Sequence, residues 1–512
     1  MVKIMSKSNL IKGTAILTIA GLLTRFIGFF YRIYLSNVMG AELIGVYQLV
    51  FPVYGICFTI YASGIQTAIS TLVATELGKK HYKNIPKILR IGMVLSVSTA
   101  LILSFLLYYN SDTIATNLLM EASSASSLRI LAFVFPFCGM TACINGYYYG
   151  LKKAGVPATT QLLEQVVRVI SVFILASIIG NGDAKVTCEL AVLGIVFGEI
   201  ASDLYNIISL LCTSASREVK KLSKISGFIE IQNTKLAKVL IKLSLPLTGN
   251  RLLISILHSV EAIIIPSMLK KHGLSNSEAL SVYGILTGMS IPFIMFPSAI
   301  TNSLSVLLLP TISEAQASRN YDMIRKTSAL SIKYSILIGI LSMGVFLTFG
   351  KELGNVIFKN ELAGELLMTL AWMCPFLYIT TTLSSIINGL GKAHLTFANS
   401  IIGHATGILL ILWLVPKDGI RGYLISLLIS QLVITSFDGI IVIKNIRPSF
   451  HSVNWILKPG IIIAGSSYLI FRIYEYMAPT GILMLLAFCV LLCTLYIILL
   501  SITKAISIKD FK

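Results

Sequence analysis

The chain has little charge for its length. Only 12% of its 512 residues are Asp, Glu, Lys or Arg, whereas 55% are hydrophobic and the mean hydropathy is +0.85. Soluble domains carry about 25% charged residues, so this composition excludes them and indicates a polytopic α-helical membrane protein. Acidic residues are also scarce, 22 against 41 basic ones. The basic residues gather in short loops between apolar segments, which is typical of membrane topology and excludes nucleic acid as the partner.

Motifs for catalysis and for metal binding are lacking too. The sequence has no CxxC pair, no zinc-ligand spacing, no phosphate-binding glycine loop, no HExxH motif and no Ser–His–Asp candidate. Most of the eight cysteines lie in apolar segments, where small core residues are expected. We therefore expect neither an enzyme nor a bound cofactor or metal, and no ATP-driven transport by this chain alone. Coupling to sodium, to protons or to the membrane potential stays open.

Fourteen apolar segments are long enough to cross a hydrocarbon core of roughly 30 Å. They cover residues 14–38, 43–70, 91–109, 128–150, 157–180, 190–212, 240–268, 280–309, 329–350, 365–389, 396–416, 422–443, 456–474 and 481–502. An even number places both termini on one side of the bilayer, and the excess of Lys and Arg on that side predicts that it is the cytoplasm. The chain is thus expected to be a multi-pass protein of the cell membrane, in contact with the lipid bilayer.

The sequence also repeats itself at a shift of 239 positions. Pro136-Phe137 and the later Gly150-Leu151-x-Lys153-Ala154 recur as Pro375-Phe376 and Gly389-Leu390-x-Lys392-Ala393. Each half holds six spans, so both halves keep the same orientation. The predicted fold is all-α, with about fourteen transmembrane helices in two pseudosymmetric six-helix bundles, 1–212 and 243–443. A basic cytoplasmic linker, 213–242, joins them, and residues 444–512 add two helices and a cytoplasmic tail.

The first span carries two arginines on one helical face. Arg25 and Arg32 share a stripe with Gly21 and Gly28, because these positions follow the i, i+4, i+7, i+11 spacing. An arginine at the bilayer centre costs roughly 3 kcal/mol by insertion scales, so two on one stripe favour a wet interior face. The alternative is that Arg32 extends to the membrane interface.

The seventh span, related to the first by a shift of 230, has a polar stripe as well. Arg251 and His258 map onto Gly21 and Gly28, and Glu261 follows one turn later. We expect Arg251 and His258 to face the two arginines across the pseudo-twofold axis and, with Glu261, to contact a substrate. His258 could instead be a hydrogen-bonded packing residue.

A second set of charges lies on other spans. Glu164 and Arg168 are an i, i+4 pair on the fifth span, and Glu199 and Asp203 are another on the sixth. Asp438 is the counterpart of Glu199 at the 239 shift. These five residues are predicted to form a lattice of structural pairs, with a proton or sodium relay as the alternative. Glu76 after the second span is expected to have its counterpart in Glu314 after the eighth, and both are expected to act as gate or loop ion pairs.

The opening of the chain resembles a known family. Arg25-Phe-Ile-Gly28-Phe-Phe-Tyr-Arg32 and Gly40-Ala-Glu42-Leu-Ile-Gly45-Val-Tyr47-Gln48 are similar to the start of the stage V sporulation protein B family. That family is part of the multidrug/oligosaccharidyl-lipid/polysaccharide exporter superfamily, with the MurJ lipid II flippases and the MATE antiporters. The resemblance implies alternating access and a polyprenyl-pyrophosphate-linked glycan as cargo. It also implies a cationic cavity that includes Arg25 and Arg32.

Three functions follow as hypotheses. The first is a flippase for an undecaprenyl-pyrophosphate-linked glycan, a lipid II-like precursor of peptidoglycan or of the spore cortex, because guanidinium groups bind phosphate oxygens bidentately. The second is a cation-coupled multidrug antiporter that uses Glu199, Asp203 and Glu261. The third is a non-transporting scaffold for wall assembly. Cell-wall synthesis proteins are expected partners.

Overall fold

The computed structural model describes residues 7–179, 186–213, 232–448, 450–477 and 481–506, together with Arg217, Val219, Lys221 and Leu222. Every element that these residues form is a helix, which confirms the all-α class. The chain divides into two compact units, Met1–Ile263 and Ile264–Lys512. The division into domains at a 213–242 linker stays a prediction, since 223–231 and several neighbouring residues lie outside the described ranges.

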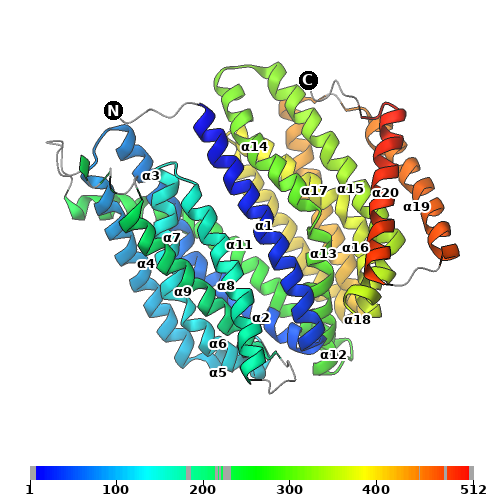
Figure 1. The fold of residues 1–512 in the computed structure, drawn as a ribbon, viewed down its shortest axis with the longest axis horizontal. Coiled ribbons are helices and arrows are strands. Elements are labelled where there is room, and N and C mark those ends of the chain that lie inside the picture. Colours follow the sequence, from blue (N-terminus) through cyan, green and yellow to red (C-terminus); the bar gives the residue numbers. More distant parts are fainter. Residues whose placement is uncertain are drawn as a thin grey trace. The chain divides into compact units, whose positions relative to one another are not determined.

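The first unit is built from long helices (Figure 1). Short π- or 3-10-helical segments between or within them are named η here. Its elements are α1 (Lys7–Met39), α2 (Ala41–Phe58), η1 (Thr59–Ser63), α3 (Gly64–Gly78), α4 (Asn84–Tyr109), α5 (Ser111–Thr113), η2 (Ile114–Leu118), η3 (Ala122–Ser124), α6 (Ala125–Ala132), α7 (Val134–Gly150), α8 (Gly155–Ile179), α9 (Cys188–Cys212) and the first part of α11 (Asn233–Lys271). The boundary between the units falls inside α11. Residues 233–242, which were expected to belong to a linker, form the first turns of this helix.

The second unit follows the same plan and adds two helices. Its elements are the end of α11, then α12 (Asn276–Gly284), η4 (Ile285–Ser290), α13 (Ile291–Met295), α14 (Ser298–Ala317), α15 (Tyr321–Ile357), α16 (Glu361–Leu370), η5 (Ala371–Met373), α17 (Cys374–Gly389), α18 (Ala393–Ile446), η6 (Val453–Leu457), α19 (Lys458–Met477) and α20 (Ile482–Ile502).

Twelve helices in the described ranges are long and apolar enough to cross a membrane, or 13 if α6 and α7, bent by 47°, form one span. Pro136 in the first turn of α7 has no N–H to donate to the preceding turn, which explains the bend. The segments 396–416 and 422–443, expected as separate spans, are two helices of α18 on either side of Gly419, whose backbone is not helical (φ 57°, ψ −134°). They pack against each other, since Ser430 of the second donates to Gly403 O of the first at 2.8 Å. The number fourteen stays a prediction.

The internal repeat is visible in the helix ends. α7 and α17 both finish in a Schellman turn, in which Lys153 N–H donates to Tyr148 O (2.9 Å) and Lys392 N–H donates to Ile387 O (3.1 Å). The left-handed residue of each turn is Lys152 (φ 56°) and its equivalent Gly391 (φ 78°). Packing repeats as well: a Cβ at Gly150 would lie 2.7 Å from Ser70 O on α3, and one at Gly389 would lie 3.1 Å from Leu309 O on α14. Each pair is related by 239, so the two halves share one local architecture.

The same geometry corrects the expected match of Glu76 with Glu314. α3 and α14 end in equivalent Schellman turns, in which His81 N–H donates to Glu76 O and Asn320 N–H donates to Ala315 O, both at 2.9 Å. Glu76 is therefore equivalent to Ala315, one residue away from Glu314. One residue rotates a side chain by about 100° around a helix, which is why Glu76 is buried and Glu314 is exposed.

The two C-terminal helices pack on the second unit through α15. Tyr496 of α20 donates a hydrogen bond to Leu337 O at 3.3 Å. Phe471 and Tyr474 of α19 lie 6.3 and 5.4 Å from the ring of Phe349 on α15. Figure 1 shows α19 and α20, in orange and red, beside α15. These apolar and aromatic contacts attach the helices that lie outside the repeat.

Candidate functional site

The two arginines of α1 lie on its exposed side. Arg25 and Arg32 are exposed, whereas Tyr31 and Leu35 of the same helix are buried. α1 packs on α8, with the Tyr34 ring 4.1 Å from that of Phe173. Within the described ranges neither arginine has a carboxylate partner. Uncompensated guanidinium groups in an apolar helix form a site that an anion can occupy.

Arg32 borders a buried polar cluster that we call the Arg168 cluster, made of Tyr47, Glu164, Arg168 and Glu199. The Arg168 guanidinium forms an ion pair with Glu164, one turn away on α8. It also interacts electrostatically with Tyr47 of α2 and with Glu199 of α9. Arg32 is close enough to interact with Arg168 and Tyr47. The structure therefore joins two sets of charges that the sequence analysis treated separately.

Small residues bring α9 against this ion pair. A Cβ at Gly198 would lie 2.8 Å from Glu164 O, and one at Gly194 would lie 3.1 Å from Arg168 O. This close approach places Glu199, which is only 4% exposed, beside the pair. Two buried atoms of the cluster, Arg168 Nε and Glu199 Oε2, have no hydrogen-bond partner among the residues that the structure describes. The predicted Glu164–Arg168 pairing is confirmed, and the cluster holds two carboxylates for one arginine.

Asp203 and Asp438 lie apart from this arginine. Asp203 is buried one turn after Glu199 and accepts a hydrogen bond from Thr141 of α7 at 3.3 Å. Asp438, in the second unit, is 1% exposed and accepts hydrogen bonds from Ser384 (2.8 Å) and Asn399 (2.7 Å). Asp438 thus has neutral partners where its equivalent, Glu199, has an arginine nearby. The role of these carboxylates as structural pairs stays a prediction, with a proton or sodium relay as the alternative.

Arg251 lies in the part of α11 that belongs to the first unit, and it is hydrogen-bonded within that unit. Its Nη1 donates to the carbonyl (2.7 Å) and to the hydroxyl (2.6 Å) of Ser63 in η1, and Nε and Nη2 remain available. Further along α11, Ser259 donates to Pro52 O at 3.1 Å. His258 is exposed and Glu261 is half-buried. The predicted facing of Arg251 and His258 toward Arg25 and Arg32 stays a prediction.

Glu76 has a local role in the structure. Its carboxylate accepts a hydrogen bond from Asn84 (2.6 Å) and lies 3.2 Å from His81 Nδ1. These contacts stabilise the turn between α3 and α4. The expected roles of Glu76 and Glu314 as gate or loop ion pairs stay predictions. Sequence reasoning missed Tyr47 of the Arg168 cluster. The pattern Glu42-x-x-x-Val46-Tyr47 recurs as Glu278-x-x-x-Val282-Tyr283, and this recurrence was a usable signal.

Comparison with known proteins gives matches over most of the chain. The family described as Polysaccharide biosynthesis protein matches residues 10–316, and the MatE family matches residues 252–413. Stage V sporulation protein B of Bacillus subtilis (strain 168) is 27% identical over 464 residues, which cover 90% of this chain and 88% of that protein. Lipid II flippase MurJ of the same organism is 22% identical over 472 residues, 84% of each chain.

Two solved structures share the fold. A lipid II flippase MurJ in an inward closed conformation has a TM-score of 0.66 at 14% identity, over 95% of this chain and 98% of that chain. An inward-facing multidrug resistance MATE family transporter of the MOP superfamily has a TM-score of 0.68 at 14% identity, over 83% and 94%. The relatives whose names state an activity are flippases and transporters, in agreement with the expectation that this chain is not an enzyme.

Proposed function

Because this chain belongs to the polysaccharide biosynthesis protein family, we propose that it flips an undecaprenyl-pyrophosphate-linked glycan across the cell membrane. The cargo is a lipid II-like peptidoglycan precursor, with the spore cortex as a destination. The similarity to stage V sporulation protein B and to a lipid II flippase supports this proposal. Transport proceeds by alternating access, with both termini in the cytoplasm and cell-wall synthesis proteins as partners.

The observation that carries the proposal is the pair of exposed arginines on α1 that lack a carboxylate partner in the described part of the chain. A pyrophosphate is a multiply charged anion, and guanidinium forks bind its oxygens bidentately. Arg25 and Arg32 lie seven residues apart, about 10 Å along a helix. They can therefore contact successive parts of one diphosphate-sugar head group while the prenyl tail stays in lipid.

Arg251 is proposed as the third cationic contact. Its two bonds to Ser63 restrict the guanidinium and leave Nε and Nη2 for a phosphate. A restricted arginine loses less side-chain entropy when a ligand binds. His258 and Glu261, about two and about three turns beyond it on α11, are assigned to the polar groups of the glycan.

The test is a flipping assay in vesicles that contain the purified full-length protein, combined with complementation. Arg25→Ala should abolish flipping without reducing membrane insertion, and Arg25→Lys should restore it only in part because lysine lacks the bidentate fork. Arg129→Ala is the matched control, because Arg129 is an exposed arginine paired with Asp112. Full flipping by Arg25→Ala would refute the proposal. A vesicle assay without flipping by the wild type would favour the scaffold.

A second function, cation-coupled drug export, is favoured by the MatE match over residues 252–413. Its carboxylates would be Glu199, Asp203 and Glu261. Binding in detergent separates the two: the flippase should bind a lipid pyrophosphate, and the antiporter a hydrophobic cation. Sodium, protons or the membrane potential would supply the driving force in either case, and dissipating each gradient in turn identifies which one is used.

A further inference from the structure

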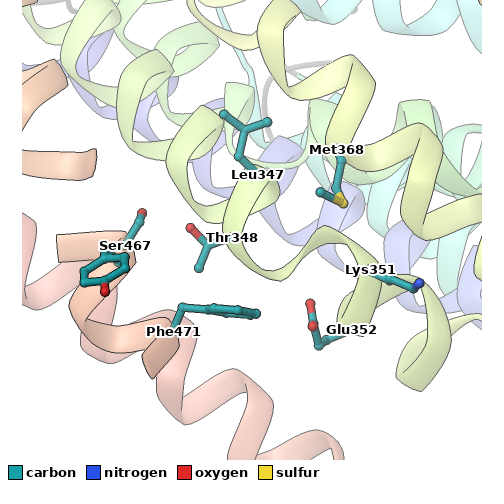
Figure 2. Close-up of a pocket in the computed structure, with 8 residues that line it drawn as sticks. Leu347, Thr348, Lys351, Glu352, Met368, Ser467 and Phe471 are labelled. Atoms are coloured by element: carbon teal, nitrogen blue, oxygen red, sulfur yellow. The ribbon is translucent and has the colours of Figure 1, made fainter. Parts of the chain in front are cut away.

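A cavity of about 390 Å³ lies in the second unit, where α19 meets α15 and α16 (Figure 2). Its residues come from three elements, so the added helix α19 completes it. The lining residues are Leu347, Thr348, Lys351, Glu352, Met368, Ser467, Tyr468 and Phe471. The proposed cargo site uses none of them.

Three side chains of this cavity carry oxygen atoms that can accept a hydrogen bond. Among the described residues, the buried atoms Glu352 Oε2 and Ser467 Oγ have no hydrogen-bond partner. The Thr348 hydroxyl donates to Gly344 O at 2.7 Å, so its own oxygen can still accept. A carboxylate taken out of water is costly unless a cation or a donor compensates it. The cavity is therefore suited to a ligand that brings positive charge and several N–H groups.

The rest of the lining fits an amphipathic ligand. Figure 2 shows Glu352 and Phe471 among the residues that line the cavity, and Leu347 and Met368 form its apolar part. Aromatic faces attract ammonium groups. Arg472 already lies over the ring of Tyr468, 5.4 Å from its centroid, which leaves Phe471 as the available aromatic wall.

The lysine at the cavity can contact an anionic group next to that ammonium. Lys351 Nζ lies 2.9 Å from Glu361 in an ion pair whose two side chains are 52% and 63% exposed. Exposed pairs of this kind contribute little to stability, so Lys351 can exchange its partner at little cost. Glu352 and Lys351 together offer one negative and one positive group to a zwitterion.

We propose that this cavity binds the head group of an aminophospholipid such as phosphatidylethanolamine. Its primary ammonium donates hydrogen bonds to Glu352, Ser467 and Thr348, and its phosphate meets Lys351. The site discriminates against choline lipids, because a trimethylammonium group has no N–H to donate. Glu352 lies near the end of α15, five residues before Ile357, where a lipid head group is within reach of the interface. A bound lipid would link α19 to α15.

The test measures lipid binding to delipidated full-length protein by native mass spectrometry and by the shift in melting temperature. Phosphatidylethanolamine should bind and raise the melting temperature more than phosphatidylcholine or phosphatidylglycerol with the same acyl chains. Glu352→Gln should weaken phosphatidylethanolamine binding about tenfold or more, since a charged acceptor is lost. Glu475→Gln, which changes an exposed carboxylate on α19 outside the cavity, should leave it unchanged.

Three results would overturn the proposal. Equal shifts with all three lipids would mean that the head group is not recognised. An equal shift with free ethanolamine would assign the cavity to a soluble amine. Unchanged lipid selectivity in Glu352→Gln would remove the carboxylate from the site. Ser467→Ala serves as a second variant if Glu352→Gln fails to fold, and it should reduce the preference for phosphatidylethanolamine over phosphatidylcholine.

Discussion

Arg168 is expected to be a main stabilising residue of the first unit. Replacing it by Met removes the one arginine of the Arg168 cluster and leaves Glu164 and Glu199 next to each other without a cation. The side chains of Arg168 and Glu164 are only 19% and 23% exposed, so solvent compensates the lost pair poorly. Breaking a buried pair by removing one partner costs about 3–5 kcal/mol. For a pair that keeps some exposure, we expect about 3 kcal/mol.

A double-mutant cycle separates the pair from its surroundings. Glu164→Gln should cost about 1 kcal/mol, since Arg168 keeps its interaction with Glu199. The double variant Glu164→Gln with Arg168→Met should be less destabilised than the sum of the single variants, because it no longer leaves Glu164 as an unpaired charge. Unfolding in mixed micelles of detergent and sodium dodecyl sulfate measures these differences.

The control is Arg129→Met, at an ion pair with Asp112 whose side chains are 47% and 67% exposed. It should change the stability by no more than about 1 kcal/mol. If Arg168→Met destabilises the protein no more than this control, the cluster is not a structural element. A relay for ions or protons would then be the better interpretation of its carboxylates.

Two further predictions concern the same units. Glu199→Gln should reduce stability, measured as the melting temperature, with a smaller effect on flipping. If the variant keeps its melting temperature and loses its dependence on an ion gradient, Glu199 belongs to a relay. Gly150→Val and Gly389→Val should each destabilise the protein by several kcal/mol, since either side chain meets the neighbouring helix at less than van der Waals distance. Gly155→Ala, which meets nothing within 4 Å, is the control. A tolerated Gly389→Val beside a damaging Gly150→Val would contradict equivalent packing in the two halves.

The internal repeat shows which features of the fold the sequence pattern could predict. Pro136 and Pro375, with the glycines that follow them, predicted two related halves, and both segments fold into helices with identical end turns. The pattern was less reliable at Glu76 and Glu314. Two glutamates near the ends of equivalent spans looked alike in sequence, but the turn geometry places them one residue out of register.

The candidate site likewise has a contact that the sequence could predict and contacts that it could not. The i, i+4 spacing of Glu164 and Arg168 was sufficient to predict their ion pair, because that contact lies within one helix. The approach of Glu199 and Tyr47 to Arg168 was not predictable in this way, since it depends on how α2, α8 and α9 pack.

The sequence alone determined the membrane class, the helical content, the internal repeat and the contacts within single helices. These properties depend on composition and on spacing along the chain, which is local information. Only the tertiary structure decided which charged residues meet, where Arg251 is bonded and where α19 closes a cavity over Glu352. The physical reason is that side chains on different helices become neighbours through interhelical packing, which small residues such as Gly198 permit at particular positions.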